Sequence, residues 1–175
     1  MSSDKELQAL CESGRYENAF SLIVQQYSQR LYWHIRKMVL LHDDADDILQ
    51  NTLLKAWTGL STFRWESQIF TWLFRIATNE VLTFLRKSKS LKQMPLEDRL
   101  DADQSLFTGD QIQKALQKAI LRLPPKQRLV FNMRYFDQVR YQDMSRILGT
   151  SEGALKASYH HAAAKVEETL KELLL

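Results

Sequence analysis

The chain has few of the residues that interrupt or cross-link a polypeptide. Its 175 residues include five glycines, three prolines and one cysteine, Cys11. Scarce glycine and proline, with few runs of alternating β-branched residues, leave few of the turns that a sheet protein needs. A single cysteine cannot form an intramolecular disulfide. The sequence therefore favours an all-α fold without internal cross-links.

Long hydrophobic runs are also missing. The longest apolar stretches, such as MVLL at 38–41, are far shorter than the roughly 20 residues that cross a bilayer. The N-terminal segment lacks the basic-then-apolar layout of a signal peptide. We therefore expect a cytoplasmic protein with no membrane insertion.

Charge of one sign is not in large excess, because the net charge is only +3. Its distribution is more informative than its sum. Residues 1–87 hold ten basic and ten acidic side chains, whereas residues 111–175 hold eleven basic and six acidic ones. The basic excess therefore lies in the last third of the chain. The hydrophobic content of the whole chain, 45%, is enough for a folded protein.

Three stretches of the N-terminal half have helical spacing. Apolar residues from Ala19 to Val39 predict one amphipathic helix. A second follows the acidic cluster at 43–47, with its inward side running from Ala45 to Trp57, and Gly59 fits its end. A third, over 69–87, carries a polar stripe at intervals of three and four. The stripe consists of Trp72, Arg75, Asn79, Thr83 and Arg86.

Residues 88–110 lose this periodicity and predict a linker between two small helical domains. A further helix spans Ile112 to Leu123 and stops at Pro124 and Pro125, of which Pro125 is well placed to open the next helix. Three or four short helices are expected in the remainder. The predicted organisation is therefore 1–87, 88–110 and 111–175.

A helix-turn-helix pattern covers residues 139–168. Ser145 is small enough for two crossing helices to approach, Gly149 can adopt the left-handed backbone of the turn, and Ser151 can cap the next helix. The inward stripe of that helix is Leu155, Tyr159, Ala162 and Val166. The opposite face would then enter the major groove of DNA.

The outward face holds Lys156, Ala157, His160 and His161. Lysine can reach guanine acceptors or phosphate, alanine can touch a thymine methyl, and imidazoles can donate to or accept from base edges. Arg140, Arg146 and Lys165 are candidates for phosphate contacts, and Ser151 completes the candidate set. An ordinary pair of solvated amphipathic helices has the same pattern, so that alternative stays open.

Metal binding and cofactors are not expected. His160 and His161 are adjacent, but consecutive helical residues diverge by about 100°, and no cysteine or carboxylate constellation accompanies them. A helical hydrolase or nuclease that uses His34 or His42 with the acids at 43–47 is a further alternative. No HExxH, P-loop or nucleophile-elbow motif supports it, so no enzymatic activity is expected.

Three blocks in order resemble the extracytoplasmic-function sigma factors of bacterial RNA polymerase. They are DADDILQNTLLKAW (44–57), FTWLFRIATNEVLTFLR (70–86) and LPPKQRLVFNMRYFDQVRYQDMSRILGTSEGALKASYHHA (123–162). The resemblance implies a sigma-2 domain over 1–87 that binds polymerase and opens the minus-10 element. It also implies a sigma-4 domain over 111–175 that reads the minus-35 element.

The resemblance assigns partners and residues. Asp47, Gln50 and Leu54 would face the β′ clamp helices of core polymerase, and the β flap, promoter DNA and an anti-sigma factor are the other implied partners. The acids at 43–47 equally suit a helix's first turn without any partner. The linker acids Asp98, Asp101 and Asp103 would enter the RNA exit channel, or would simply be solvated.

The loop at 61–68 and the stripe resemble the part of the family that holds a flipped minus-10 base. Stacking surfaces come from Phe63 and Trp65, and charge comes from Arg64 and Arg75. Trp72 and Arg86 belong to the same candidate set as members of the stripe. Asn79 offers a donor and an acceptor to a base edge, and Thr83 completes the set. A purely structural role in the core is the open alternative for Phe63 and Trp72.

Three positions depart from the family pattern. Thr83 stands where the family usually has Asp, and Ser158 and His161 stand where Arg is common. Thr83 removes a charge near the minus-10 helix, so no salt bridge is expected there. Ser158 and His161 lie in the recognition helix, so we expect weaker or differently specified minus-35 contacts. A free-standing helix-turn-helix regulator is the alternative function, but it leaves the aromatic loop and the polar stripe unexplained.

Overall fold

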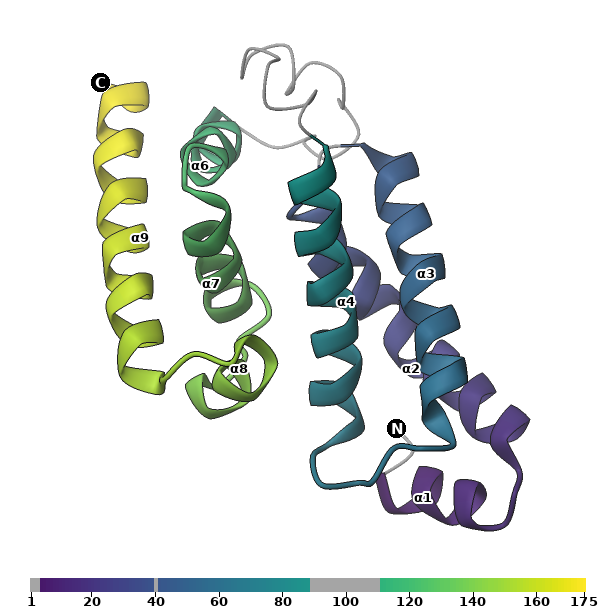
Figure 1. The fold of residues 1–175 in the computed structure, drawn as a ribbon. Helices are drawn as coiled ribbons and strands as arrows, with labels where there is room; N and C mark the ends of the chain where they lie inside the picture. The colour runs from purple at the N-terminus through teal and green to yellow at the C-terminus, as the bar shows by residue number, and fades with distance from the viewer. Residues whose placement is uncertain (1–3, 40, 89–110) are drawn as a thin grey trace. The chain divides into compact units, whose positions relative to one another are not determined.

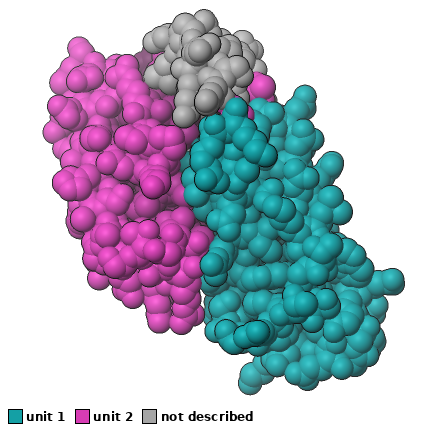
Figure 2. All heavy atoms as spheres, viewed as in Figure 1, with its two compact units in different colours: residues 1–39, 43–87 teal, residues 40–42, 88–175 magenta. Residues whose placement is uncertain are grey.

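The computed structural model describes residues 4–39, 41–88 and 111–175. Within these ranges the chain forms eight helices and no strand (Figure 1). It divides into two compact units (Figure 2). The first holds α1, α2, α4 and α3 from Asp43 onward, and the second holds α6 to α9. The prediction of two small all-α domains is confirmed, and the predicted linker lies, from residue 89 on, outside the described residues.

The first unit is built on long helices that each bury one face. It comprises α1 (Asp4–Glu12), α2 (Tyr16–Arg36), α3 (His42–Leu60) and α4 (Ile69–Lys87). Ile23 and Leu31 of α2 and Leu73 and Phe74 of α4 are buried in its core. The predicted bounds of α4 are confirmed. Helix α2 begins and ends three residues before the predicted range of 19–39.

Helix α1 is absent from the sequence predictions, yet it fixes the start of α4. The Asp4 carboxylate accepts a hydrogen bond of 3.0 Å from the backbone N–H of Ile69. An acceptor with negative charge at this place satisfies an N–H that the helix leaves unpaired and favours the helix dipole. Leu7 and Cys11, which follow Asp4 at the helical spacing of one face, are buried. The hydrogen bond between Asp4 and Ile69 therefore anchors the C-terminal end of the 61–68 loop to α1.

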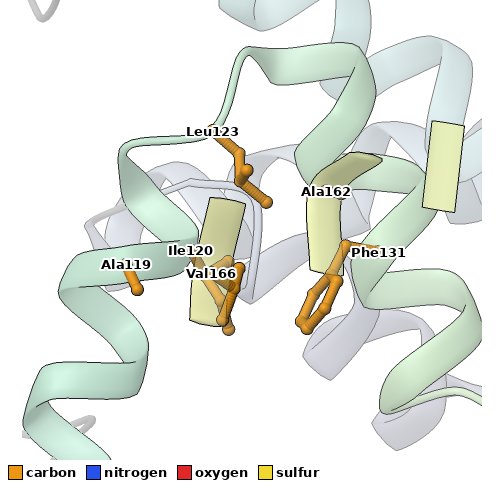
Figure 3. Packing of buried hydrophobic residues seen from close by; sticks show 6 residues of the cluster. All are labelled: Ala119, Ile120, Leu123, Phe131, Ala162 and Val166. Atoms are coloured by element: carbon orange, nitrogen blue, oxygen red, sulfur yellow. The ribbon is translucent and has the colours of Figure 1, made fainter. Parts of the chain in front are cut away.

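The second unit comprises α6 (Gln111–Leu121), α7 (Pro125–Tyr135), α8 (Tyr141–Leu148) and α9 (Glu152–Leu174). Pro124 is the N-cap of α7 and Pro125 opens it, as predicted. Residues of α6, α7 and α9 interlock in one apolar cluster (Figure 3). Its buried members are Ala119, Ile120, Leu123, Phe131, Ala162 and Val166. Three helices follow α6, but α9 has 23 residues and is not short.

The turn between α8 and α9 has the expected geometry. Gly149 adopts φ 65° and ψ 29°, and its N–H donates to the Ser145 carbonyl at 2.9 Å. The Ser151 hydroxyl accepts from the Ala154 N–H at 3.3 Å and caps α9. The predicted left-handed turn at Gly149 and the predicted cap at Ser151 are confirmed. No helix within the described ranges is both long and apolar enough to cross a membrane.

Replacement of Gly149 by alanine tests the left-handed turn. A Cβ at Gly149 would meet no atom within 4 Å, so the penalty is purely conformational, about 1–2 kcal/mol. We expect Gly149→Ala to lower the free energy of unfolding in urea by about this amount, and Gly149→Asn by less.

Gly153→Ala is the matched control, because a Cβ at Gly153 also meets open space and Gly153 lies in the first turn of α9. Alanine is the better helix former, so this variant should be neutral or more stable. Equal losses for both alanine variants would contradict a backbone origin.

Candidate nucleic-acid and protein interfaces

One face of α9 packs in the core of the second unit, so the opposite face is exposed. Leu155, Ala162 and Val166 are buried, and the helical repeat then turns the intervening residues outward. The candidate residues Lys156, Ala157, His160 and His161 are all exposed. They therefore share one accessible surface, and Tyr159 is half-buried at its border.

The other minus-35 candidates surround this face in different ways. Arg140 precedes α8 and Arg146 lies in its last turn, and both are exposed. The Lys165 ammonium donates to the Gln127 amide oxygen at 3.3 Å, which ties α9 to α7. Ser151 is used as the cap, although a hydroxyl that accepts one hydrogen bond can still donate another.

Three aromatic side chains meet where the 61–68 loop joins α4. The rings of Phe63 and Trp72 stack with centroids 4.7 Å apart, and those of Phe63 and Trp65 are 4.9 Å apart. All three residues are half-buried. They therefore support the loop and still present ring surface to solvent, so the structural and functional roles are compatible. Trp65 has φ 58°, an uncommon backbone conformation for a bulky residue.

The polar stripe of α4 continues from this aromatic group. Arg75, Asn79 and Arg86 are exposed, and Thr83 is half-buried. The Arg86 guanidinium donates to the Thr83 hydroxyl at 3.2 Å. The contact is therefore a hydrogen bond to a neutral hydroxyl and not an ion pair. On the neighbouring helix, Lys55 forms an ion pair with Glu80, which joins α3 to α4.

Gly59 has a different role from the predicted one. It does not end α3, which continues to Leu60. A Cβ at Gly59 would lie 3.0 Å from Cζ2 of Trp72. The glycine is therefore required by the close approach of the indole, which local sequence patterns do not reveal.

A groove of about 930 Å³ runs between α2 and α3. Two of the three candidate polymerase contacts, Gln50 and Leu54, line it, and Leu54 is 63% exposed. Asp47 lies one turn before Gln50 and is exposed. The groove is lined by Glu17, Phe20, Ser21, Val24, Gln25, Gln50, Leu53, Leu54 and Trp57. An apolar floor with a polar and acidic border suits an apolar helix with basic flanks.

The prediction that Trp57 lies on the inward side of α3 is wrong. Trp57 is 40% exposed, because its ring packs edge-on against Phe20 at 5.2 Å and lines the groove instead of entering the core. Four groove residues, Phe20, Val24, Leu53 and Trp57, were not predicted to belong to the protein interface. The i, i+4 spacing of Phe20 and Val24, and of Leu53 and Trp57, is the signal that could have found them.

The acidic start of α3 carries mutual repulsion. Burial raises the pKa of Asp44, and the neighbouring charges of Asp47 and then Asp43 raise it further. A raised carboxyl pKa means that the ionised form is disfavoured here. A basic partner would relieve this repulsion, which the favourable interaction of the carboxylates with the helix dipole does not remove.

His34 is not placed for chemistry. It is fully buried, its Nε2 lies 2.9 Å from the Thr78 hydroxyl, and its ring packs on Phe74 at 4.7 Å. It therefore joins α2 to α4 inside the core, away from any substrate. Among the residues that the structure describes, no group of three or more His, Cys, Asp or Glu is arranged to hold a metal ion.

These features define a two-unit helical protein with a helix-turn-helix in one unit and a groove between α2 and α3 in the other. Comparison with known proteins gives its family. Residues 23–91 match Sigma-70 region 2, and residues 113–166 match Sigma-70, region 4. The ECF RNA polymerase sigma factor SigM of Mycobacterium tuberculosis is 34% identical over 170 residues, which cover 96% of this chain and 85% of SigM. SigW of Bacillus subtilis is 25% identical over 171 residues, which cover 90% of this chain and 91% of SigW.

Solved structures show the same fold. The sigma factor RpoE, crystallised with the anti-sigma factor NepR from Bartonella quintana, aligns with a TM-score of 0.69 at 25% identity and covers 87% of this chain and 96% of its own. CnrH, in complex with the cytosolic domain of CnrY, aligns with a TM-score of 0.75 at 22% identity and covers 98% and 99%.

The chain belongs to the extracytoplasmic-function RNA polymerase sigma factors. It is a promoter-directing subunit of transcription initiation, as the three sequence blocks predicted. A free-standing helix-turn-helix regulator is not favoured, because region 2 of the family also matches the first unit.

The contact between Gly59 and Trp72 predicts a specific double-mutant result. A methyl group at position 59 must displace the half-buried indole by a few tenths of an ångström. Overpacking of this kind costs about 1–3 kcal/mol, and the better helix propensity of alanine offsets about 1 kcal/mol of it. We expect Gly59→Ala to lower the unfolding free energy in urea by up to about 2 kcal/mol. In a Trp72→Phe background the same change should cost little, because the smaller ring lacks the Cζ2 atom.

A double-mutant cycle measures this coupling. Equal costs of Gly59→Ala with tryptophan and with phenylalanine at position 72 would show that Gly59 is needed for another reason.

Proposed function

We propose that the two units of this sigma factor divide promoter recognition between them. Residues 1–87 bind core polymerase and hold the opened minus-10 strand, residues 111–175 read the minus-35 element, and residues 88–110 connect them. The observation that carries this proposal is the exposed face of α9, whose rotation is fixed by its buried stripe. A helix presented in this way fits the major groove of B-DNA.

At the minus-35 element, the reading residues are Lys156, Ala157, His160 and His161. Lys156 donates to a guanine edge or a phosphate, Ala157 packs on a thymine methyl, and the imidazoles contact base edges. Arg140, Arg146, Ser151 and Lys165 contact phosphates and set the register. Because Ser158 and His161 replace family arginines, fewer charged contacts support this element, and its affinity depends more on the bases.

At the minus-10 element, the half-buried cluster of Phe63, Trp65 and Trp72 stacks on an unpaired base. Stacking of a base on an aromatic ring contributes about 1–3 kcal/mol. Arg64 and Arg75 attract the phosphates of the single strand. Asn79 pairs with the base edge, and Thr83 and Arg86 extend the same stripe along α4.

Core polymerase docks on the groove between α2 and α3. Leu54 and Trp57 provide apolar surface, and Asp47 and the raised-pKa Asp44 favour a cationic partner such as the β′ clamp helices. The second unit meets the β flap. An isolated chain with a net charge of +3 has little non-specific affinity for DNA, so polymerase assembly precedes promoter binding.

Regulation by an anti-sigma factor is part of the proposal. RpoE and CnrH, which share the fold, were both solved in complex with such a protein or with the cytosolic part of CnrY. The groove and the α9 face are exposed in this chain and are natural targets for an inhibitor. The sigma factor acts in the cytoplasm, makes or breaks no bond and uses no cofactor.

Run-off transcription from a promoter library tests the division of labour. We expect core polymerase to initiate at a shared pair of upstream elements only when this protein is added. Lys156→Ala or His161→Ala should lower specific initiation about 5- to 100-fold, which corresponds to the loss of one base contact. Polymerase binding should stay at the wild-type level.

Lys171→Ala is the matched control, because Lys171 is an exposed lysine on the same helix that pairs with Glu167. It should leave initiation unchanged. Unaltered transcription with Lys156→Ala and His161→Ala would remove these residues from the minus-35 site. Failure of the wild-type protein to redirect initiation would contradict the proposal as a whole.

Charge reversal at Asp47 tests the docking groove. We expect Asp47→Arg to weaken binding to core polymerase at least about tenfold, because it places like charges opposite one another. The defect should shrink as salt rises. Leu54→Ala should weaken binding about 5- to 30-fold without affecting stability, because an exposed leucine contributes little to the core.

Glu12→Arg and Leu174→Ala repeat the same chemical changes at exposed positions outside the groove. Binding is measured by titration of labelled protein with core enzyme. If the paired variants lose equal affinity, the groove is not the docking site.

A further inference from the structure

Tyr141 connects the recognition helix to the rest of the second unit. The Arg134 guanidinium carbon lies 5.1 Å from the Tyr141 ring centroid, and the Lys156 ammonium lies 5.7 Å from it. Both distances fall in the range of cation–π interactions. The three residues come from α7, α8 and α9, so one aromatic ring links every helix of the helix-turn-helix region.

The ring is held in place by its surroundings. Tyr141 is the first residue of α8 and is half-buried. Arg134 also donates to the Val139 carbonyl at 3.4 Å, and the buried Val139 returns a backbone hydrogen bond to Met133 at 2.9 Å. The turn between α7 and α8 is therefore fixed on both sides of Gln138, whose φ is 52°.

Lys156 is exposed, and its side chain has four methylene groups. Such a side chain populates many rotamers when nothing restrains it. An attractive ring beside its ammonium restricts this motion before DNA arrives. Arg134 and Lys156 place two positive charges about one ring, and a phosphate or a guanine edge is the partner that relieves their repulsion. The restricted Lys156 side chain and the two neighbouring positive charges therefore both favour the arrangement that binds DNA.

We propose that Tyr141 is a positioning residue for minus-35 recognition, which holds the Lys156 ammonium at the face of α9 that reads DNA. This inference rests on the proposed function. It makes Tyr141 a determinant of specificity that acts through another side chain.

A double-mutant cycle in the full-length protein tests the inference. The probe is a pair of linear promoters from the run-off library that differ only in the minus-35 element, one selected and one scrambled. The readout is the ratio of initiation from the two promoters with core polymerase. We expect Tyr141→Leu to lower this ratio about 3- to 10-fold, the size of a cation–π contact at a partly exposed site.

The conservative change Tyr141→Phe retains the ring and should keep the ratio within about twofold of wild type. In a Lys156→Ala background, Tyr141→Leu should have no further effect, because the cation that it positions is gone. A graded series of fluorinated phenylalanines at position 141 keeps the ring's shape while weakening its negative face. This series preserves the test if the leucine variant does not fold, and the ratio should fall with each added fluorine.

The outcomes distinguish the positioning role of Tyr141 from the proposed minus-35 recognition on which it rests. Equal losses from Tyr141→Leu with lysine and with alanine at position 156, or a flat fluorine series, would overturn the positioning role and leave minus-35 reading intact. A wild-type protein with the same initiation from both promoters would overturn the minus-35 assignment itself, and the Tyr141 role with it.

Discussion

The rotation of α9 about its own axis is the constraint on which the minus-35 surface depends. Ala162 and Val166 enter the cluster formed with α6 and α7, and Leu155 on the same helix is also buried. Because these residues fix which face of α9 is buried, they also fix which face is exposed. A turn of 100° about this axis would bury Lys156 and expose Leu155. The packing that stabilises the second unit therefore also decides which side chains reach DNA, so a core substitution can alter specificity without touching a base.

Two glycines set the directions of the functional segments for different physical reasons. Gly149 is needed for its positive φ, because any residue with a Cβ is strained in the left-handed turn that aims α9. Gly59 is needed for its small size, because the Trp72 ring occupies the space that a side chain would fill. The first constraint is local to five residues, whereas the second arises only when α3 and α4 are packed together. A conformational requirement can be recognised in the sequence, and a steric one of this kind cannot.

The same distinction explains how much of the structure was predictable. The bounds of α4, the proline pair before α7 and the Gly149 turn with its Ser151 cap follow from local periodicity and backbone chemistry, and each was predicted. Helix α1, the exposure of Trp57 and the ring contacts of Tyr141 were missed. Each depends on a partner distant in sequence: Asp4 meets Ile69, Phe20 meets Trp57, and Tyr141 meets Arg134 and Lys156. The minus-10 and minus-35 residues themselves stay predictions, which the exposure of the α9 face and the partly accessible aromatic rings support.

Opposite local charge explains how a nearly neutral chain can serve two charged partners. At the acidic start of α3, burial and the charges of Asp47 and Asp43 raise the pKa of Asp44, so a cationic protein partner would favour its ionised form. The region around α9 has positive charge instead, since Arg134 and Lys156 both lie beside the Tyr141 ring. If both surfaces carried the same sign, the larger net charge would raise affinity for DNA or for polymerase at any site. Separate charges of opposite sign keep non-specific binding weak, so that tight binding requires the correct partner at each surface.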